Sequence, residues 1–267
     1  MSKVVLITGA SSGIGKSTAE FLSAKGFRVY GTGRNPKINE NKGYSLISLD
    51  VTKPETISLA IDLILEKEGR LDVLVNNAGM GITGPIEDTP TNEMRKVFET
   101  NFFGAIDMMK AVLPQMRKQQ SGTIINVTSI AGYMGLPYRG VYSATKGALD
   151  LVSEAARMEV KEFGVNIVTI APGDVATNIA AGRYHTPVFD NSAYKEKYQM
   201  NLDLMDSHVD SGMNPIKMAE KIHQIVNLKQ PSVHYKVGAF MEKFSIVLKK
   251  ILPSKIYEKL LMNHYKL

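Results

Sequence analysis

Apolar residues along the chain form short continuous runs that alternate with longer segments of helical spacing. Several of these runs have the length and composition of strands that are buried on both faces. The predicted strands are Val4–Thr8, Phe27–Thr32, Leu46–Leu49, Val73–Val75, Ile124–Val127 and Val165–Ile170. The predicted helices are Ile14–Ala24, Pro54–Lys67, Asn92–Lys118, Tyr142–Lys161 and Pro215–Asn227. Gly26, Gly69 and Gly164 each separate a helix from the next strand, where a glycine can cap the last carbonyls.

Strands that alternate with helices of this length predict βαβ units, right-handed crossovers and a parallel sheet with helices on both faces. We therefore expect a single doubly wound α/β domain over residues 1–267, with a sheet of about seven strands. The connection Arg34–Tyr44 is close to the minimum length of a crossover, so we expect little or no helix there.

Composition narrows the functions that this fold can carry. The chain has 267 residues, of which 44% are hydrophobic and 22% charged, as in an ordinary soluble globular protein. It contains no cysteine, which excludes disulfides, thiolate metal sites and a cysteine nucleophile. The net charge of +6 is spread along the sequence, so we expect no nucleic-acid partner. No apolar run approaches the ~20 residues that cross a bilayer, and the N-terminus does not resemble a signal peptide, so we expect a cytoplasmic protein.

The segment between Thr8 and Thr18 predicts a phosphate-binding loop at a helix N-terminus, with two interpretations. As Ala10–Ser17 it is a P-loop with alanine in place of the first glycine, and Asp50, at the end of an apolar strand, would position Mg²⁺. This interpretation predicts an ATP-dependent phosphotransferase, but nothing later in the chain supplies the other parts of such a site. As TGxxxGxG, the same segment is the turn of a dinucleotide-binding fold.

Polar residues at the ends of later strands favour the second interpretation. The tetrapeptide NNAG (76–79) follows the fourth strand, Ser129 closes the fifth, and PGDVAT (172–177) follows the sixth. Tyr142 and Lys146 are four residues apart on a predicted helix, so the phenol and the ammonium would be neighbours. In open α/β sheets, ligands bind at the carboxyl ends of the strands, where these residues are expected to gather.

Together these motifs resemble the short-chain dehydrogenase/reductase family. TGASSGIG matches the family's TGxxxGxG loop, NNAG its strand-four motif, YSATK its YxxxK and PGDVAT its PGxVxT. The resemblance extends from about Lys3 to Ile179. It implies a Rossmann-type fold, a nicotinamide cofactor and hydride transfer between that cofactor and a carbonyl or alcohol carbon. It places four residues in the family's catalytic tetrad: Asn101, Ser129, Tyr142 and Lys146.

The resemblance implies a role for each of these four residues. Tyr142 would be the acid/base, with Lys146 favouring its phenolate and hydrogen-bonding the nicotinamide ribose. Ser129 would hold the substrate oxygen, and Asn101 would interrupt its helix locally and support a water that relays protons. A cofactor-sensing regulator on the same fold is the alternative, although such a protein usually shows a broken tetrad.

Further cofactor contacts implied by the family lie at the same strand ends. They are Gly9, Ser11, Ser12, Gly13, Ile14, Gly15, Asp50, Val51, Asn77, Ala78, Gly79, Pro172, Gly173, Val175 and Thr177. Gly33 stands where an acid would pair with the ribose 2′-hydroxyl of NAD, and Arg34 follows it. Because a guanidinium suits a phosphate dianion, NADP(H) is the predicted cofactor and NAD(H) the alternative.

The substrate walls are expected from Tyr133, Met134 and Leu136, from the loop after Gly79, and from residues 179–213, which resemble the family's substrate lid. The lid offers the apolar and aromatic side chains Tyr184, Val188, Phe189, Tyr194, Tyr198, Met200 and Met205. This composition favours a lipophilic ketone or aldehyde as the substrate. The polar cluster between Asp203 and Asp210 fits no standard metal site, so we assign no metal.

Residues 239–267 form a basic, amphipathic extension. Its apolar side chains Phe240, Phe244, Val247, Leu248, Ile251 and Leu252 are expected on one face. Three roles are open: it covers the substrate entrance, forms a subunit contact or touches a membrane surface, and packing on the chain itself or on a second copy is the default. Because the helices from Asn92 and from Tyr142 commonly form the family's oligomer interface, we expect a homodimer or homotetramer.

Overall fold

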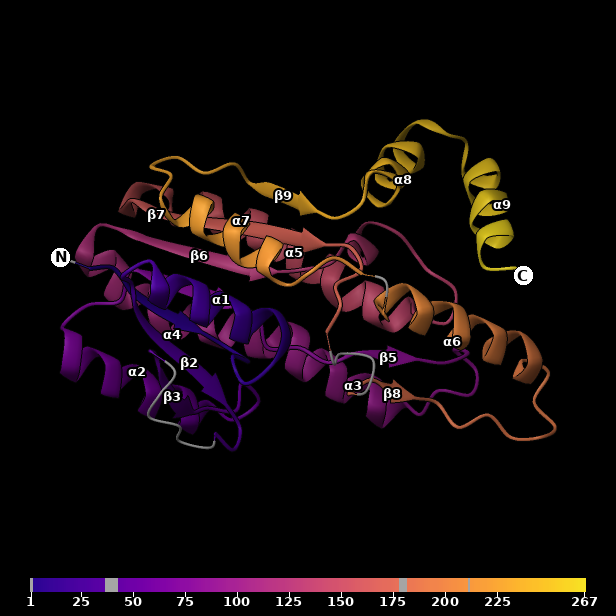
Figure 1. Cartoon of the computed structure of the whole chain (residues 1–267), viewed down its shortest axis with the longest axis horizontal. Coiled ribbons are helices and arrows are strands. Elements are labelled where there is room, and N and C mark those ends of the chain that lie inside the picture. Colours follow the sequence, from indigo (N-terminus) through magenta and orange to yellow (C-terminus); the bar gives the residue numbers. More distant parts are fainter. Residues whose placement is uncertain (1, 37–42, 178–181, 211) are drawn as a thin grey trace.

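The computed structural model describes residues 2–36, 43–177, 182–210 and 212–267, with only the backbone of 206–210. Seven parallel strands form one sheet in the order β3-β2-β1-β4-β6-β7-β9, which confirms the doubly wound α/β fold (Figure 1). The strands are β1 (Val4–Ile7), β2 (Arg28–Gly33), β3 (Ser45–Ser48), β4 (Val73–Asn76), β6 (Gly122–Val127), β7 (Val165–Pro172) and β9 (His234–Val237). The order reverses direction between β1 and β4, which is where such folds bind nucleotides.

Alternate residues of the central strands enter two separate cores. Val4 and Leu6 of β1 pack in the core that includes side chains of α2 (Pro54–Glu68), α4 (Gly104–Gln119) and α5 (Gly140–Glu159). Val5 and Ile7 pack in the other core, with side chains of α1 (Gly13–Ala24) and α7 (Ile216–Val226). Both faces of the sheet are therefore covered, which is why its strands read as continuous apolar runs.

The long helix expected from Asn92 is divided by a π-turn. It consists of α3 (Thr91–Phe98), the π-turn Glu99–Phe103 and α4, and Asn101 lies at the centre of the turn. The local interruption expected at Asn101 is thus present.

Several elements were not predicted from the pattern. They are the half-buried edge strand β9, the helix α6 (Lys195–Asp210), and a short parallel pair formed by β5 (Ile82–Thr83) and β8 (Tyr184–His185). The absence of helix in the Arg34–Tyr44 connection stays a prediction, because residues 37–42 lie outside the described part of the chain.

The C-terminal extension is two helices, α8 (Phe240–Ile251) and α9 (Ser254–His264), separated at Pro253. They lie at the opposite end of the molecule from α2 and β3 (Figure 1). The expectation of one common apolar face is wrong, because Leu248 and Leu252 pack inward, against a core that contains Ile246 and Tyr257. None of the helices in the described ranges is long and apolar enough to span a bilayer.

Candidate active site

The loop after β1 and the loop after β4 are joined by hydrogen bonds. Thr8 Oγ1 accepts the backbone N–H groups of Asn77 and Ala78, each at 2.9 Å. Asn77 Nδ2 donates to the carbonyl oxygens of Thr8 and Gly9 at 3.0 and 3.1 Å. A β-carbon at Gly15 would overlap the Gly9 carbonyl oxygen, so α1 begins directly against this loop. These contacts explain why the two motifs occur together.

The start of α1 fits a diphosphate. Gly9 and Gly13 have φ values of +67° and +54°, in the region that favours glycine. Ser12 precedes the helix without capping it through its side chain, so the first N–H groups of α1 face the cavity described next. Lys16, the cation of the P-loop interpretation, lies within α1 beside Glu20, at 3.8 Å.

A cavity of about 1650 Å³ runs along the carboxyl ends of the strands. The sequence-predicted residues that line it are Gly9, Ser11, Ser12, Gly13, Ile14, Arg34, Asp50, Val51, Asn77, Ala78, Gly79, Ser129, Tyr142, Lys146, Pro172, Gly173, Val175 and Thr177. Gly15 and Asn101 are not among the lining residues, because Gly15 packs against the loop and Asn101 lies behind Met80. A cavity of this length and donor set fits an extended dinucleotide with a substrate beside it.

Arg34 lies where this cavity meets a second, smaller one of about 530 Å³. Ser11, Ser48 and Lys53 line the smaller cavity together with Arg34. Burial alone would raise the pKa of Asp50, but hydrogen bonds from Thr52 and the charges of Arg34 and Lys53 hold that pKa below its ordinary value. Sequence reasoning missed Lys53, whose only signal was its position at the start of a helix that follows a strand end.

Lys146 is buried under the loop after β4. Its Nζ donates to the Val127 carbonyl oxygen at 2.9 Å. A β-carbon at Gly79 would lie 3.5 Å from this Nζ and 3.2 Å from Asn101 Oδ1, so both polar groups converge on one loop. Burial lowers the pKa of Lys146 from its ordinary 10.5 to about 8.

Two cations flank the ring of Tyr142, which lies in the first turn of α5. Lys146 Nζ is 5.9 Å from the ring centroid, and the Arg139 guanidinium carbon is 5.7 Å from it. Ser129 lines the same cavity, and its Oγ accepts the Ala131 N–H at 3.1 Å at the start of a 3₁₀ turn. Tyr142 and Ser129 therefore line one cavity, with two positive groups near the phenol ring.

Asn101 holds the loop after β4 from behind. Its Oδ1 accepts the Met80 N–H at 2.8 Å, and its Nδ2 donates to the Met80 carbonyl oxygen at 2.9 Å. Nδ2 is also 3.2 Å from Thr145 Oγ1, which donates to the Tyr142 carbonyl oxygen. The side chain therefore links the loop to the first turn of α5.

The substrate side of the cavity is built differently from the prediction. Met134 and Leu136 line it as expected, but Tyr133 turns away toward Asp150, and burial together with that carboxylate raises its pKa. The loop after Gly79 lines the cavity as expected, through Met80, Gly81 and Ile82, and so do both ends of the predicted lid, through Gly182, Arg183, Gly212 and Met213. None of the seven apolar and aromatic lid side chains expected in the wall is among the described lining residues. Tyr198, for example, is buried against Thr83, with its Oη donating to that carbonyl oxygen at 2.9 Å. The predicted residues from Asn178 to Ala181 lie outside the described part.

The C-terminal extension supplies the missing wall. Its lining residues are Met241, Glu242, Ser245, Leu248, Tyr257, Leu260, Leu261, His264 and Tyr265. Tyr257 Oη lies 3.0 Å from Met134 Sδ, and Asn201 Nδ2 donates to the Tyr265 carbonyl oxygen at 3.0 Å. The extension therefore packs on its own chain, over the cavity.

Glu242 fastens α8 to the end of β7. Its Oε1 accepts the Asp174 N–H at 2.7 Å and its Oε2 the Ala239 N–H at 2.6 Å. A β-carbon at Gly173 or at Gly238 would overlap this carboxylate. The PGDVAT motif thus provides a cradle for Glu242 as well as part of the cavity wall, and no sequence signal had pointed to Glu242.

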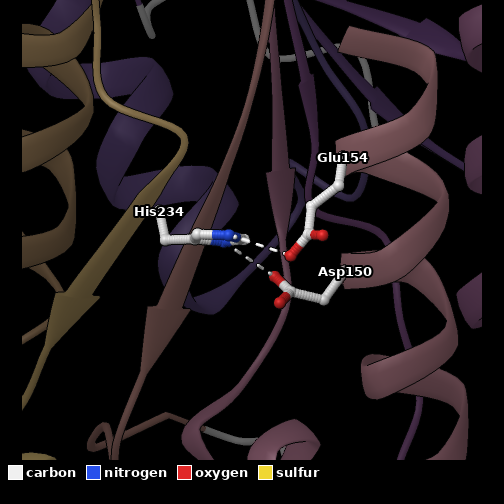
Figure 2. Close-up of side chains that lie close together, drawn as sticks. All are labelled: Asp150, Glu154 and His234. Carbon is white, nitrogen blue, oxygen red and sulfur yellow. Dashed lines mark ion pairs between the residues drawn. The ribbon is translucent and has the colours of Figure 1, made fainter. Parts of the chain in front are cut away.

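The side chains of Asp150 and Glu154, on α5, and of His234, on β9, point toward one another and form a cluster (Figure 2). The Nε2 of His234 is 3.0 Å from Glu154 Oε1, and its Nδ1 is 3.5 Å from Asp150 Oδ1 and 2.9 Å from Thr169 Oγ1. The two ring nitrogens of His234 therefore face different partners within the chain. The cluster joins β9, which leads into α8, to α5.

Comparison with known proteins identifies relatives of this chain. The family model described as short chain dehydrogenase matches residues 3–187. The chain is 40% identical over 264 residues to the 3-ketodihydrosphingosine reductase of Bacteroides thetaiotaomicron, covering 98% of each protein.

Two solved structures share the fold and a substantial part of the sequence. A short-chain dehydrogenase from Streptomyces avermitilis has a TM-score of 0.81 at 32% identity, covering 97% of each chain. The structure of ElxO with NADP bound has a TM-score of 0.73 at 29% identity, covering 89% of this chain and 97% of ElxO.

Proposed function

This chain belongs to the short-chain dehydrogenase/reductase family, and from that premise we propose that it is an NADPH-dependent reductase of a long-chain, lipophilic ketone. The observation that carries the proposal is the division of the cavity. Polar groups gather around Tyr142, whereas the wall beyond them includes Met134, Leu136, Leu248 and Leu261. Such a wall favours a ketone with a long hydrocarbon tail.

The activity of the Bacteroides relative supports a sphingoid ketone, 3-ketodihydrosphingosine, as the first candidate substrate. Its carbonyl lies near one end of a long saturated chain, so the reacting atoms would sit at Tyr142 and the tail along the C-terminal helices.

The residues around Tyr142 divide the work of reduction. When bound, the nicotinamide supplies the hydride to the carbonyl carbon. Tyr142 Oη gives its proton to the carbonyl oxygen, which completes the alcohol. Ser129 Oγ donates a hydrogen bond to the same oxygen, and Lys146 and Arg139 stabilise the phenolate that remains on Tyr142. Asn101 keeps the Met80 loop against α5 throughout.

Arg34 and Lys53 support the preference for NADPH. Both line the smaller cavity, together with the hydroxyl-bearing Ser11 and Ser48. Asp50 lines the same cavity, so the two cations and one carboxylate leave a net positive charge, which together with the hydroxyl groups suits a ribose 2′-phosphate.

The proposed assembly is a homo-oligomer formed through α4 and α5. Leu151 and Met158 of α5 are 68% and 72% exposed and lie seven residues apart, on one face of the helix. Phe103, directly before α4, is 47% exposed. This is the surface on which relatives of this type commonly pair, and its apolar side chains suit a second copy.

The test is the rate of cofactor oxidation with NADPH or NADH and a series of ketones of increasing chain length, ending with 3-ketodihydrosphingosine in micelles. We expect kcat/KM to rise about fourfold for each methylene that the cavity buries, and NADPH to exceed NADH. A rate that does not depend on chain length would contradict the lipophilic substrate. Tight NADPH binding without turnover of any ketone would favour the regulator, and competition by Mg-ATP would favour the P-loop interpretation.

A further inference from the structure

The outer face of α8 carries a row of exposed apolar side chains. Phe240, Phe244, Val247 and Ile251 follow the spacing of one helix face and are between 37% and 72% exposed. The rings of Phe240 and Phe244 stack with centroids 5.6 Å apart and planes 14° apart. Single exposed apolar residues are ordinary, but a row of them marks an interaction surface.

The outer row is not the side of α8 that packs on the rest of the chain. The inner face of α8 is already packed: Ile246 is buried, Glu242 is fixed to β7, and Ser245 lines the cavity. The side of α8 that packs on the described part of the chain is therefore the one opposite the outer row.

Positive charge lies beside the outer row. Residues 239–267 contain six lysines and two glutamates, and one of the glutamates is the inward-facing Glu242. Lys243 and Lys250 border the row along one side of α8, and Lys255 and Lys259 are exposed on α9. Phenylalanine and leucine bordered by lysine are typical of helices that lie in the surface of a membrane with anionic lipids. A second copy is a poorer occupant, because it would bring the lysines of both chains together, and lysine is depleted in protein interfaces.

The substrate cavity opens beside this row. Met241 of α8 and Leu260 of α9 both line the cavity, yet they are 65% and 46% exposed. These two side chains therefore form an apolar rim between the cavity and the outer surface of the extension.

We propose that α8 and α9 dock this protein on the surface of a bilayer that contains anionic lipids, with the rim of the cavity turned toward the lipid. The docking rests on the surface of the extension alone. Only its purpose, the delivery of a ketone from the bilayer, rests on the proposed function.

Co-sedimentation of the full chain with vesicles tests the docking. The vesicles contain phosphatidylcholine alone or with about a third of phosphatidylglycerol, at low and at high salt. We expect binding to the anionic vesicles that weakens with salt. The double variant Lys243→Gln, Lys250→Gln should lower the partition coefficient about 25-fold, which is about fivefold for each charge. Phe240→Ser with Phe244→Ser should abolish binding.

The matched control is Leu59→Ser with Leu228→Ser, which removes two exposed apolar side chains that lie outside both the extension and the proposed subunit interface, and it should leave vesicle binding unchanged. NADPH titration reports whether each variant is folded. Equal binding of both apolar variants, or none by the parent chain, would overturn the proposal. One further result would overturn the proposal. If the parent chain does not bind vesicles, and sedimentation velocity shows that Phe240→Ser with Phe244→Ser abolishes self-association, then a second copy covers the row.

The proposed function can fail separately. If the chain binds anionic vesicles but reduces no long-chain ketone, docking stands and the proposed substrate is wrong. If it reduces the ketone in micelles but does not bind vesicles, the substrate stands and docking is wrong.

Discussion

The two ends of the cavity are held in place by different parts of the chain. At the cofactor end, backbone groups of the β1 and β4 loops meet through Thr8 and Asn77, and Gly15 leaves no room for a side chain. At the substrate end, the wall comes from helices that are fixed by side chains such as Glu242 and Tyr257. Backbone geometry tolerates few residue types, whereas a wall of side chains can change while the fold persists. The cofactor end is therefore constrained by backbone geometry, whereas the wall at the other end, which Met134 and Leu136 share with the extension, depends on side chains that can change.

Replacement of Tyr142 by Phe is expected to have the largest effect, because the two ends meet at this residue. Without the Oη group no proton reaches the carbonyl oxygen, so kcat/KM should fall about 10³-fold. The dissociation constant of NADPH should change little, because the ring remains in place. Steady-state rates and a fluorescence titration measure the two quantities. Tyr138→Phe, four residues earlier in the chain, is the control and should retain activity. A Tyr142→Phe variant with ordinary rates would mean that another group supplies the proton.

Lys146 should make the stability of the cofactor-free protein depend on pH. Its pKa is about 8 in the folded protein and near its ordinary 10.5 in the unfolded chain, so the unfolded state binds more protons between these values. Stability contributed at this site is therefore lowest below pH 8 and rises with pH across the window, by up to about 3 kcal/mol. Urea unfolding of the parent and of Lys146→Met at several pH values should show a difference that changes over this range. For the exposed Lys161→Met, the difference in unfolding free energy from the parent should not change with pH. If the difference for Lys146→Met also does not change with pH, burial does not lower the pKa of Lys146.

Exchange of Gly33 for Asp together with Arg34 for Val should reverse part of the cofactor preference. A β-carbon at Gly33 would lie 3.5 Å from the Ser11 Cβ, so the acid fits without a clash. The ratio of kcat/KM for NADPH over NADH should fall by about 10- to 100-fold, which is the worth of a charged hydrogen bond or two. Lys53→Gln should lower the same ratio by a smaller factor. An unchanged ratio would mean that the 2′-phosphate binds elsewhere.

Glu242→Gln is expected to have the smallest effect and to act on the substrate end alone. The amide has one acceptor oxygen, so it can accept only one of the two N–H groups, of Asp174 and Ala239, that the carboxylate serves. The KM of the ketone should rise about tenfold, with kcat and NADPH affinity nearly unchanged. Glu258→Gln, an exposed glutamate of α9, is the matched control. Loss of NADPH binding in Glu242→Gln would show that the two ends are coupled more tightly than their contacts indicate.

The motifs of the cofactor end were readable in the sequence because each reports a local requirement, such as a glycine where Gly15 meets the preceding loop. The substrate end was not readable in this way. An apolar pattern shows that Tyr198 is buried, but not that it faces Thr83 rather than the cavity. Glu242 reads as an ordinary acid in the first turn of an amphipathic helix, and its partner Asp174 is 68 positions away. Contacts of this kind depend on how elements that are distant in the sequence pack together. The spacing of residues within one element carries no information about that packing.

The π-turn at Glu99–Phe103 sets the helical phase of everything that follows it. The buried positions Val97, Asn101, Ala105 and Met109 are four residues apart, and in an ideal α-helix each such step would turn the buried direction by about 40°. A π-turn holds more residues in one revolution, so it absorbs this drift. Asn101 can therefore face Met80 while Val97, before the turn, and Met109, after it, are both buried. Deleting one residue from the turn would let the segment form an ordinary α-helix, in which eleven steps of about 100° separate Val97 from Met109, within about 20° of three full turns. α4 would then keep its methionines in the core, and the contact of Asn101 with Met80 would be lost.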